Sequence, residues 1–244
     1  MALELLPLVI VGPGRLGRSV AQRLKQRVQP VCLVGRGEPI PPAEITWITV
    51  PDTQIAAVAV KVPVGGVVLH ASGAMGLEPL RHHSSPGSLH PLMTFPGPTT
   101  KIPIPQVVPA AISGNPTARA AATKLANLLG FTPFDVPGDR RLYHAAAVMV
   151  GNFTTVLMAE ATRLLTAAGV KPEDAPALLA PLAVASIENA VRIGPKKALT
   201  GPVARNDQQV IASHQEAIGD SMPDLLPTYN ALLAATQAMM LQND

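Results

Sequence analysis

Hydrophobic and polar positions in the first half of the chain alternate between short apolar runs and helical patterns. Residues 5–11 form a nearly continuous apolar run, which is typical of a strand buried on both faces of a parallel sheet. Within residues 15–27, Leu16, Val20 and Leu24 recur at four-residue spacing, which predicts a helix. Further strands are predicted at 31–34, 45–50, 67–71, 88–90 and 107–112. This alternation predicts an α/β fold, an open parallel sheet with right-handed crossovers.

Residues that begin or stop helices divide this half further. Asp52 is predicted to cap a helix through residues 55–61, because its carboxylate can accept an unpaired backbone N–H. Asn115 or Thr117 begins another helix, which ends before Gly130 as its left-handed stop. Between residues 91 and 109, six prolines exclude a regular helix and predict a long, stiffened loop. Loops of this length within compact domains are often functional.

The pattern becomes helical after Val136-Pro137-Gly138. Asp139 is predicted to cap a helix that runs to residue 168, with Gly169 as its stop. Its middle, residues 145–161, is apolar nearly all round, which predicts burial against other helices or a second subunit. Three further helices are predicted: one punctuated by prolines that ends near residue 194, one from Asn206 or Asp207 to residue 219, and one from residue 221. The sequence therefore predicts an α/β domain over residues 1–136 and an all-helical domain over 137–244.

Composition and charge narrow the classes of partner. The chain is 48% hydrophobic and 14% charged, so it has ample apolar surface to bury and is not disordered. Its net charge of +3 comes from scattered residues, without the basic block that a nucleic-acid partner requires. No basic leader is present, and no uninterrupted apolar run approaches the roughly 20 residues of a membrane span. We expect a soluble cytoplasmic protein that contacts neither nucleic acid nor membrane.

A single cysteine and several histidines complete the inventory of reactive side chains. Cys32 excludes an internal disulfide and a multi-cysteine zinc site, and it is expected to pack within a buried strand. No metal site is predicted. His82 and His83 lie in a polar turn and are expected to be solvated.

A glycine-rich turn follows the first predicted strand and opens the first helix. It reads Gly12-Pro13-Gly14-Arg15-Leu16-Gly17, which is the dinucleotide-binding fingerprint. The first glycine permits the tight turn, the second lets the backbone approach a pyrophosphate, and the third lets helix and strand pack closely. The alternative is a tight turn without a ligand, but the strand and helix on either side favour the dinucleotide.

Arg36 follows the second predicted strand, where an enzyme that prefers NAD places an acidic residue on the ribose 2′-hydroxyl. An arginine there would pair with a 2′-phosphate and could stack on the adenine. The sequence therefore favours NADP(H) over NAD, with a solvated surface arginine as the alternative.

Several polar residues follow other predicted strands or lie on the long helix. Val50 and Pro51 end one strand, and His70 and Ser72 follow the next, at the sheet edge where ligands of open α/β sheets bind. His90 ends a later strand and is a candidate proton donor or acceptor, because histidine titrates near neutrality. His144 and Asn152 lie two helical turns apart, on roughly the same face. For each histidine the alternative is a hydrogen-bonded structural side chain.

A compact turn precedes a C-terminal helix at residues 200–207. Arg205 could bind a carboxylate or phosphate of a substrate, with Asn206 beside it. The alternative is that Asn206 or Asp207 only caps the helix.

Five segments together resemble a known group. They are the fingerprint, Leu69-His70-Ala71-Ser72-Gly73, Leu89-His90-Pro91-Leu92, Tyr143-His144 through Asn152, and Leu199-Thr200-Gly201-Pro202 through Arg205 and Asp207. Over essentially its whole length the chain resembles Rossmann-like proteins with a helical C-terminal domain of unknown function. More distantly, it is similar to pyrroline-5-carboxylate reductases, prephenate dehydrogenases, deazaflavin-dependent NADP reductases, and the 6-phosphogluconate and 3-hydroxyacid dehydrogenases.

This resemblance implies a Rossmann-like NAD(P)-binding domain, a helical domain that forms a homodimer, a substrate cleft between the domains, and hydride transfer. The pair His90-Pro91 is similar to the histidine-proline of prephenate dehydrogenases, where the histidine serves the substrate hydroxyl. One position departs from the pattern. Hydroxyacid dehydrogenases carry a lysine four residues before the helical asparagine, and here Val148 precedes Asn152. His144 would have to substitute, or the chemistry differs.

The sequence thus favours an NADP(H)-dependent oxidoreductase that acts on a small polar carbonyl, hydroxy or imine compound. His90 or His144 would exchange the proton, Asn152 would orient the substrate, and Arg205 would anchor its charge. A second hypothesis is a dimeric dinucleotide-binding sensor or structural protein without turnover. A methyltransferase that uses S-adenosylmethionine fits less well, because the three-glycine spacing and the helical domain suit a dinucleotide.

Overall fold

The computed structural model describes residues 8–27, 30–100 and 102–242, and the contacts within it divide the chain into two compact units. Unit 1 comprises residues 1–151 and unit 2 residues 152–244. The division falls inside a long helix, whereas the sequence places the domain boundary at 136/137. The part of the first predicted strand over residues 5–7 lies outside the described residues.

Unit 1 is built on a seven-stranded sheet in the order β2-β1-β3-β4-β5-β6-β7. The strands are β1 (Leu8–Val11), β2 (Cys32–Val34), β3 (Ile45–Ile48), β4 (Val67–His70), β5 (Ser85–Pro91), β6 (Val108–Gly114) and β7 (Phe131–Asp135). Strands β1 to β5 are parallel, as predicted. Strand β6 is antiparallel to β5, which corrects the all-parallel prediction. The proline-rich connection lacks the long helix that a parallel crossover requires, so the chain returns in the opposite direction.

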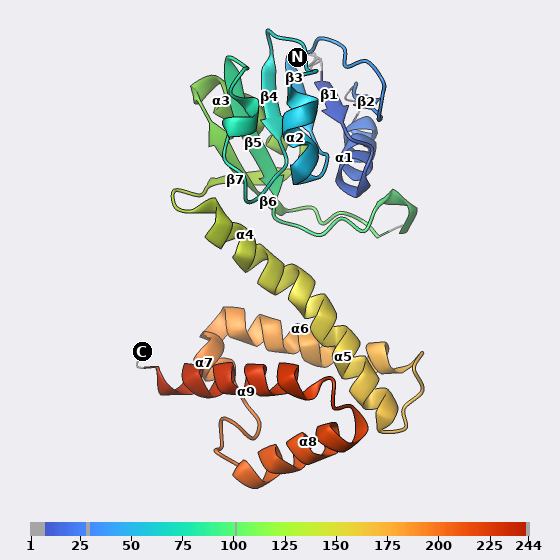
Figure 1. Ribbon diagram of the computed structural model, residues 1–244, viewed down its shortest axis with the longest axis vertical. Helices are drawn as coiled ribbons and strands as arrows, with labels where there is room; N and C mark the ends of the chain where they lie inside the picture. The colour runs from blue at the N-terminus through green and yellow to red at the C-terminus, as the bar shows by residue number, and fades with distance from the viewer. Residues whose placement is uncertain (1–7, 28–29, 101, 243–244) are drawn as a thin grey trace. The chain divides into compact units, whose positions relative to one another are not determined.

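Helices cover both faces of this sheet (Figure 1). On one face, α1 (Arg15–Gln26) and α3 (Pro116–Leu129) pack against the strands. On the other, α2 (Asp52–Ala59) and the short 3-10 helix η1 (Glu78–Leu80) enclose a second apolar cluster. Burial on both faces explains the continuous apolar run of β1, whose four described residues are all buried.

The predicted capping residues are found at the ends of α3 but not at the start of α2. Asn115 caps α3 by accepting the backbone N–H of Ala118 at 2.9 Å, and Gly130 ends that helix at a φ of 70°. Asp52 does not cap α2: Pro51 is the N-cap, and Asp52 is the first helical residue. Its carboxylate instead accepts the Ser72 hydroxyl at 2.6 Å, a contact between distant parts of the chain.

Four smaller features differ from what the sequence predicts. Cys32 is exposed because β2 is an edge strand of the sheet. His83 is buried, with its Nε2 at 3.0 Å from the Ala59 carbonyl oxygen, and it is not solvated. The proline-rich loop includes the short 3-10 helix η2 (Pro98–Thr100), and β7 was not predicted at all.

The long helix that begins after Asp139 contains a change of helical type. Asp139 caps α4 (Arg140–Val148), as predicted, by accepting the backbone N–H of Arg141 at 2.8 Å. A π-helical segment, η3 (Met149–Phe153), then leads into α5 (Thr154–Ala167). Such segments are often found at functional sites. The extra residue in this turn breaks the regular spacing that the sequence reasoning assumed between His144 and Asn152.

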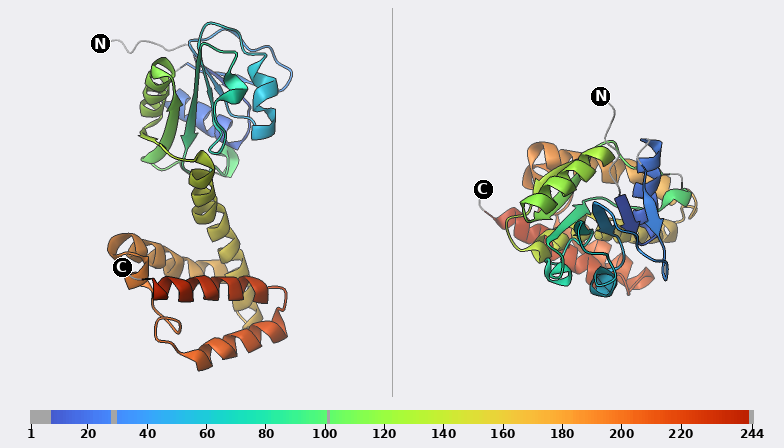
Figure 2. Two further views of the ribbon diagram at one scale, coloured as in Figure 1. Left: turned by 60° about the vertical axis from the view of Figure 1, so that its left-hand side comes forward. Right: turned by 90° about the horizontal axis from the view of Figure 1, so that it is seen from above.

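Unit 2 is helical, as predicted. It contains α5, α6 (Ala175–Ile193), α7 (Pro195–Ala198), α8 (Gln208–Ser221) and α9 (Leu226–Leu241). Helices α8 and α9 lie side by side (Figure 2), and their junction packs around Ile218, Met222 and Leu225. The predicted end of α8 at residue 219 and start of α9 at 221 are both wrong. Gly219 stays helical, and α9 begins at Leu226 with Pro227 in its first turn.

Apolar side chains on the helices of unit 2 are largely exposed. The helical stretches Arg140–Ala167 and Ala175–Ile193 are long and apolar enough to cross a membrane, judged by length and composition alone. In each stretch, none of the 18 consecutive residues with the highest mean hydropathy is buried. Val156, Leu182 and Val191 are 51%, 68% and 83% exposed. Within the described chain, other helices therefore do not bury residues 145–161, which corrects the first of the two alternatives stated above.

Candidate functional site

The strand order places a topological switch between β1 and β3, where open α/β sheets bind ligands. The glycine turn follows β1, and Val50 and Pro51 follow β3. The Thr49 hydroxyl joins the two by donating to the Gly12 carbonyl oxygen at 2.9 Å, and the Gly12 N–H donates to the Val34 carbonyl at 3.0 Å. These bonds fix the turn in the crevice at the carboxyl ends of the strands.

The three glycines of the turn have different steric surroundings. Gly12 has a φ of +113°, and a Cβ there would lie 2.8 Å from Cγ1 of Val50. A Cβ on Gly17 would overlap the Gly12 carbonyl oxygen, so α1 packs on the turn only with glycine at this position. A Cβ on Gly14 would meet no atom within 4 Å. The open space at Gly14 is where the fingerprint brings a pyrophosphate against the backbone.

Electrostatics at this turn also fit an anion. Gly14 is the N-cap of α1, and no side chain accepts its first backbone N–H groups. A helix N-terminus with uncapped N–H groups attracts phosphate charge through the helix dipole. Arg15 beside it is exposed, whereas Arg18 is occupied by donating to the Pro13 carbonyl at 2.6 Å. The predicted residues 12–17 therefore form a continuous cradle that fits a dinucleotide pyrophosphate.

The loop after β2 holds the predicted Arg36 and an acidic residue that sequence reasoning missed. Arg36 is exposed and has no partner among the residues described. The carboxylate of Glu38 accepts the Gly35 N–H at 2.5 Å. A backbone N–H at the end of β2 is thus already bonded to an internal anion. The sequence gives no sign of this hydrogen bond, because the dinucleotide fingerprint specifies the residue at the end of β2 and Glu38 lies beyond it.

His70 and Ser72 are occupied in holding the turn after β4. His70 is fully buried, its Nδ1 accepts the Ser72 N–H at 3.2 Å, and its Nε2 lies 2.9 Å from the Gly76 carbonyl oxygen. Nε2 therefore carries the proton and donates. Burial lowers the pKa of His70 to about 4, so the ring is neutral at pH 7. The predicted cofactor contacts of both residues stay predictions, and their side chains have a structural role.

The rings of His90 and His144, the two histidines that the sequence offers as alternatives for the proton transfer, lie close together beside this turn. Their ring centroids are 6.0 Å apart. Gly73 permits this approach, since a Cβ there would lie 2.9 Å from Nε2 of His90 and 2.6 Å from Cδ2 of His144. Asn152 is the first residue of unit 2, so its contribution to the site stays a prediction.

Tyr143 is a partner of His90 that sequence reasoning did not assign. Its hydroxyl lies 2.6 Å from Nδ1 of His90, and the two rings meet edge to face. Burial, with a smaller contribution from His144, lowers the pKa of His90 to about 4, and burial raises the pKa of Tyr143. Both groups are therefore neutral at pH 7. When the Tyr143 hydroxyl donates to Nδ1, Nε2 carries a proton that it can donate to a reacting atom.

The other predicted substrate residues lie in unit 2. Arg205 and Asn206 are exposed, and Asn206 has a φ of 55°. The Asn206 side chain accepts from Gln208 at 2.7 Å, while Asp207 caps α8 by accepting the Val210 N–H at 3.2 Å. Asp207 therefore has the role given above as the alternative, the capping of the helix that follows the turn. The substrate contacts of Arg205 and Asn206 stay predictions.

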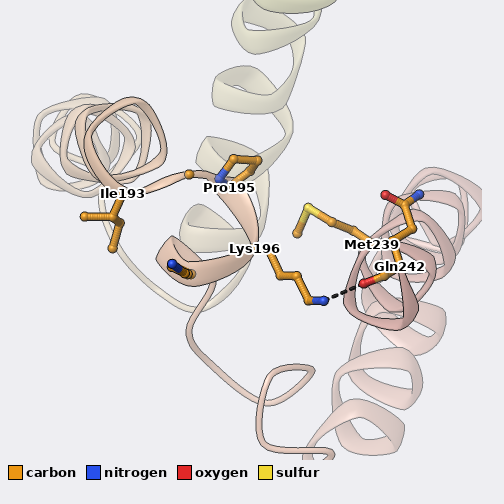
Figure 3. Close-up of a pocket in the computed structure, with 7 residues that line it drawn as sticks. Ile193, Pro195, Lys196, Met239 and Gln242 are labelled. Carbon is orange, nitrogen blue, oxygen red and sulfur yellow. Dashed lines mark hydrogen bonds between the residues drawn. The ribbon is translucent and has the colours of Figure 1, made fainter. Parts of the chain in front are cut away.

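A cavity of about 400 Å³ lies elsewhere in unit 2 (Figure 3). Its walls come from α7 and its neighbours and from the end of α9, where the Lys196 ammonium donates to the Gln242 carbonyl at 2.5 Å. It is lined by Ile193, Gly194, Pro195, Lys196, Lys197, Met239 and Gln242. No residue predicted from the sequence lines it.

One family of known proteins matches this chain over more than half of its length. The family model described as Domain of unknown function (DUF2520) matches residues 108–236, which is more than half of the sequence. The chain belongs to the DUF2520 family. This confirms the resemblance to Rossmann-like proteins with a helical C-terminal domain of unknown function. A sequence search of curated proteins finds no significant match to this DUF2520 protein.

Solved structures share the whole fold of the DUF2520 chain at low identity. Protein TM1727 from Thermotoga maritima is 23% identical with a TM-score of 0.71, and 96% of this chain and 98% of that one are covered. A Bacteroides fragilis protein, provisionally described as an NADP oxidoreductase, is 20% identical with a TM-score of 0.80 and the same coverage. A Plasmodium falciparum pyrroline carboxylate reductase with NADP bound is 11% identical with a TM-score of 0.62, covering 98% and 100%. These likenesses confirm the predicted fold class, an α/β unit followed by a helical region.

Proposed function

We propose that this DUF2520 protein is an NADP(H)-dependent oxidoreductase that acts on a small polar carbonyl, hydroxy or imine compound. The observation that carries the proposal is the open space at Gly14, at an uncapped helix N-terminus in the switch-point crevice. Arg36 at the end of β2 supports NADP(H) over NAD. The NADP in the similarly folded Plasmodium reductase supports the same choice.

The chain's own residues would divide the work around the cofactor. NADP(H), when bound, supplies or accepts the hydride. The uncapped N–H groups at Gly14 would hold its pyrophosphate, and Arg36 its 2′-phosphate. His90 would donate the Nε2 proton to the oxygen or nitrogen of the reduced compound as Nδ1 takes up the Tyr143 hydroxyl proton, so that the imidazole stays neutral and the tyrosinate is then reprotonated from water. In the oxidative direction both transfers would run in reverse: Nε2 would accept the substrate proton as Nδ1 returns its proton to the Tyr143 oxygen.

Cofactor titration with two opposed variants tests this proposal. In the wild type we expect NADPH to bind at least tenfold more tightly than NADH, measured by nicotinamide fluorescence. Arg36→Ala should weaken NADPH binding and leave NADH unchanged, because only the 2′-phosphate loses a partner. Glu38→Gln should strengthen NADPH binding, because it removes a carboxylate that bonds the Gly35 N–H beside that phosphate. Equal wild-type affinity for the two cofactors would contradict the assignment of Arg36.

The alternative is a dinucleotide-binding sensor or structural protein. The observation that favours it is Val148 at the position of the hydroxyacid dehydrogenase lysine. Oxidation of NADPH across a panel of small oxo and imino compounds separates the two. Turnover that is lost in His90→Asn supports the enzyme, whereas tight NADPH binding without turnover of any compound supports the sensor.

We further propose that the protein is a soluble, cytoplasmic homodimer whose partner covers the exposed apolar helices. Large exposed apolar patches usually mark interfaces. A second copy suits α6 better than a membrane does, because α6 carries Glu188 and Arg192 and is interrupted by Pro181. Light scattering on the purified protein should give twice the 25.4 kDa chain mass. A monomer, or a protein that needs detergent, would contradict this proposal.

A further inference from the structure

Arg140, the first residue of α4, lies beside the His90–Tyr143 pair. Its guanidinium carbon is 5.9 Å from the centroid of the Tyr143 ring, and the Tyr143 hydroxyl in turn contacts His90. One of its terminal nitrogens, Nη2, donates to the Ser72 carbonyl at 3.0 Å. Arg140 therefore links α4 to the turn after β4, at the edge of the proposed reaction site.

Most of the hydrogen-bonding capacity of Arg140 is unused. A guanidinium has five N–H donors. Within the described part of the chain, only Nη2 has an acceptor; Nε is buried without one, and no carboxylate forms an ion pair with the group. Asp52 is the nearby acid, and its carboxylate accepts from Ser72 instead. The site thus holds a positive charge without a paired negative one.

The next residue shows what a satisfied arginine looks like in this chain. Arg141 is exposed and pairs with Asp139 through Nε and Nη2, at 3.0 and 2.6 Å. Arg140 is half-buried, and removal from water lowers its pKa. Burying an unpaired cation is costly, and a negative ligand beside it offsets that cost. The difference between these adjacent arginines points to a ligand at Arg140.

We propose that Arg140 binds the carboxylate of an anionic substrate, so that the proposed reaction acts on small oxo, imino or hydroxy acids. The planar guanidinium suits a carboxylate, which it can bind through two parallel hydrogen bonds. The substrate's reacting carbon and its oxygen or nitrogen then lie near His90. This inference rests on the proposed oxidoreductase function and assigns to Arg140 the anchoring role that sequence reasoning gave to Arg205.

A matched pair of probes tests the charge requirement. Oxamate and oxamide have similar size and shape, but only oxamate carries a carboxylate. Each is titrated calorimetrically into protein saturated with NADPH. We expect oxamate to bind the wild type at least tenfold more tightly than oxamide. Arg140→Gln should abolish that preference, and Arg140→Lys should retain part of it, because lysine keeps the charge but not the two parallel bonds.

Control variants make the result specific. Arg141→Gln should retain the oxamate preference, and thermal unfolding checks that every variant is folded. Loss of the preference in Arg205→Gln but not in Arg140→Gln would overturn the proposal. So would loss of NADPH affinity in Arg140→Gln, which would make Arg140 a cofactor ligand. A wild type that binds NADPH without preferring oxamate refutes the role of Arg140 alone, whereas a wild type that binds no NADPH refutes the proposed function.

Discussion

Replacing Gly14 with alanine separates cofactor binding from folding. The backbone of Gly14 has φ −72° and ψ −170°, values open to alanine, and the added Cβ would meet no protein atom within 4 Å. The folded protein therefore accommodates the methyl group. The same methyl group would project into the space where we place the cofactor pyrophosphate. Gly14→Ala should consequently impair binding without impairing the fold.

The size of each effect follows from the local geometry. Alanine reduces the freedom of the unfolded chain, which stabilises by about 0.4–1 kcal/mol, and it is a poorer N-cap than glycine by a similar amount. We expect the free energy of unfolding to change by less than about 1 kcal/mol. Crowding one methyl group into a packed contact costs about 1–3 kcal/mol. Since about 1.4 kcal/mol is tenfold in affinity, NADPH binding should weaken about 5- to 150-fold.

Two other glycine variants serve as controls in the same assays, urea unfolding and NADPH titration. Gly138→Ala also adds a Cβ in open space but lies outside the cradle, so it should leave NADPH binding unchanged and raise the free energy of unfolding by at most about 1 kcal/mol. Gly17→Ala should destabilise the protein, because its Cβ would overlap the Gly12 carbonyl oxygen. If Gly14→Ala binds NADPH as tightly as the wild type does, the pyrophosphate does not lie at Gly14 and the cradle is misassigned.

Three further predictions concern protonation, positioning and assembly. The free energy of unfolding should fall as the pH drops from about 6.5 to about 4, because His70 and His90 bind protons in the unfolded chain but stay neutral when buried in the folded protein. His90→Asn should make this fall less steep, and an unchanged slope would contradict the burial of a neutral His90. In ¹⁵N NMR, Tyr143→Phe should change the tautomer ratio of His90, and an unchanged spectrum would exclude their hydrogen bond. Leu182→Glu should yield monomers, whereas Val64→Glu should not, although Val64, which lies in unit 1, is the more exposed of the two side chains; dimers in both variants would move the interface away from α6.

Local sequence signals predicted the parts of the fold that depend on local physics. The run of apolar residues in β1, the glycine turn and the capped start of α3 at Asn115 are each specified by neighbouring residues. The reversal of β6 and the existence of β7 were missed. Strand direction depends on how the proline-rich connection returns the chain, and β7 contains Pro133, which weakens its strand pattern.

The sequence names candidate site residues but not the contacts that these residues make. The sequence offers His90 or His144 as the proton donor; the fold places their ring centroids 6.0 Å apart, and the choice between them stays a prediction. It gave no sign that Asp52 would bond to Ser72, or that Glu38 would bond to the loop after β2, because these contacts form only when the turns are folded. Arg140 was overlooked for the same reason, since nothing local distinguishes it from Arg141.

A crystal structure of the protein with NADP⁺ tests the central claim most directly. We expect the pyrophosphate on the backbone at Gly14, the 2′-phosphate against Arg36, and C4 of the nicotinamide facing the side of the site that holds His90. Cofactor density that lies away from the glycine turn, or a nicotinamide ring remote from both His90 and His144, would contradict it.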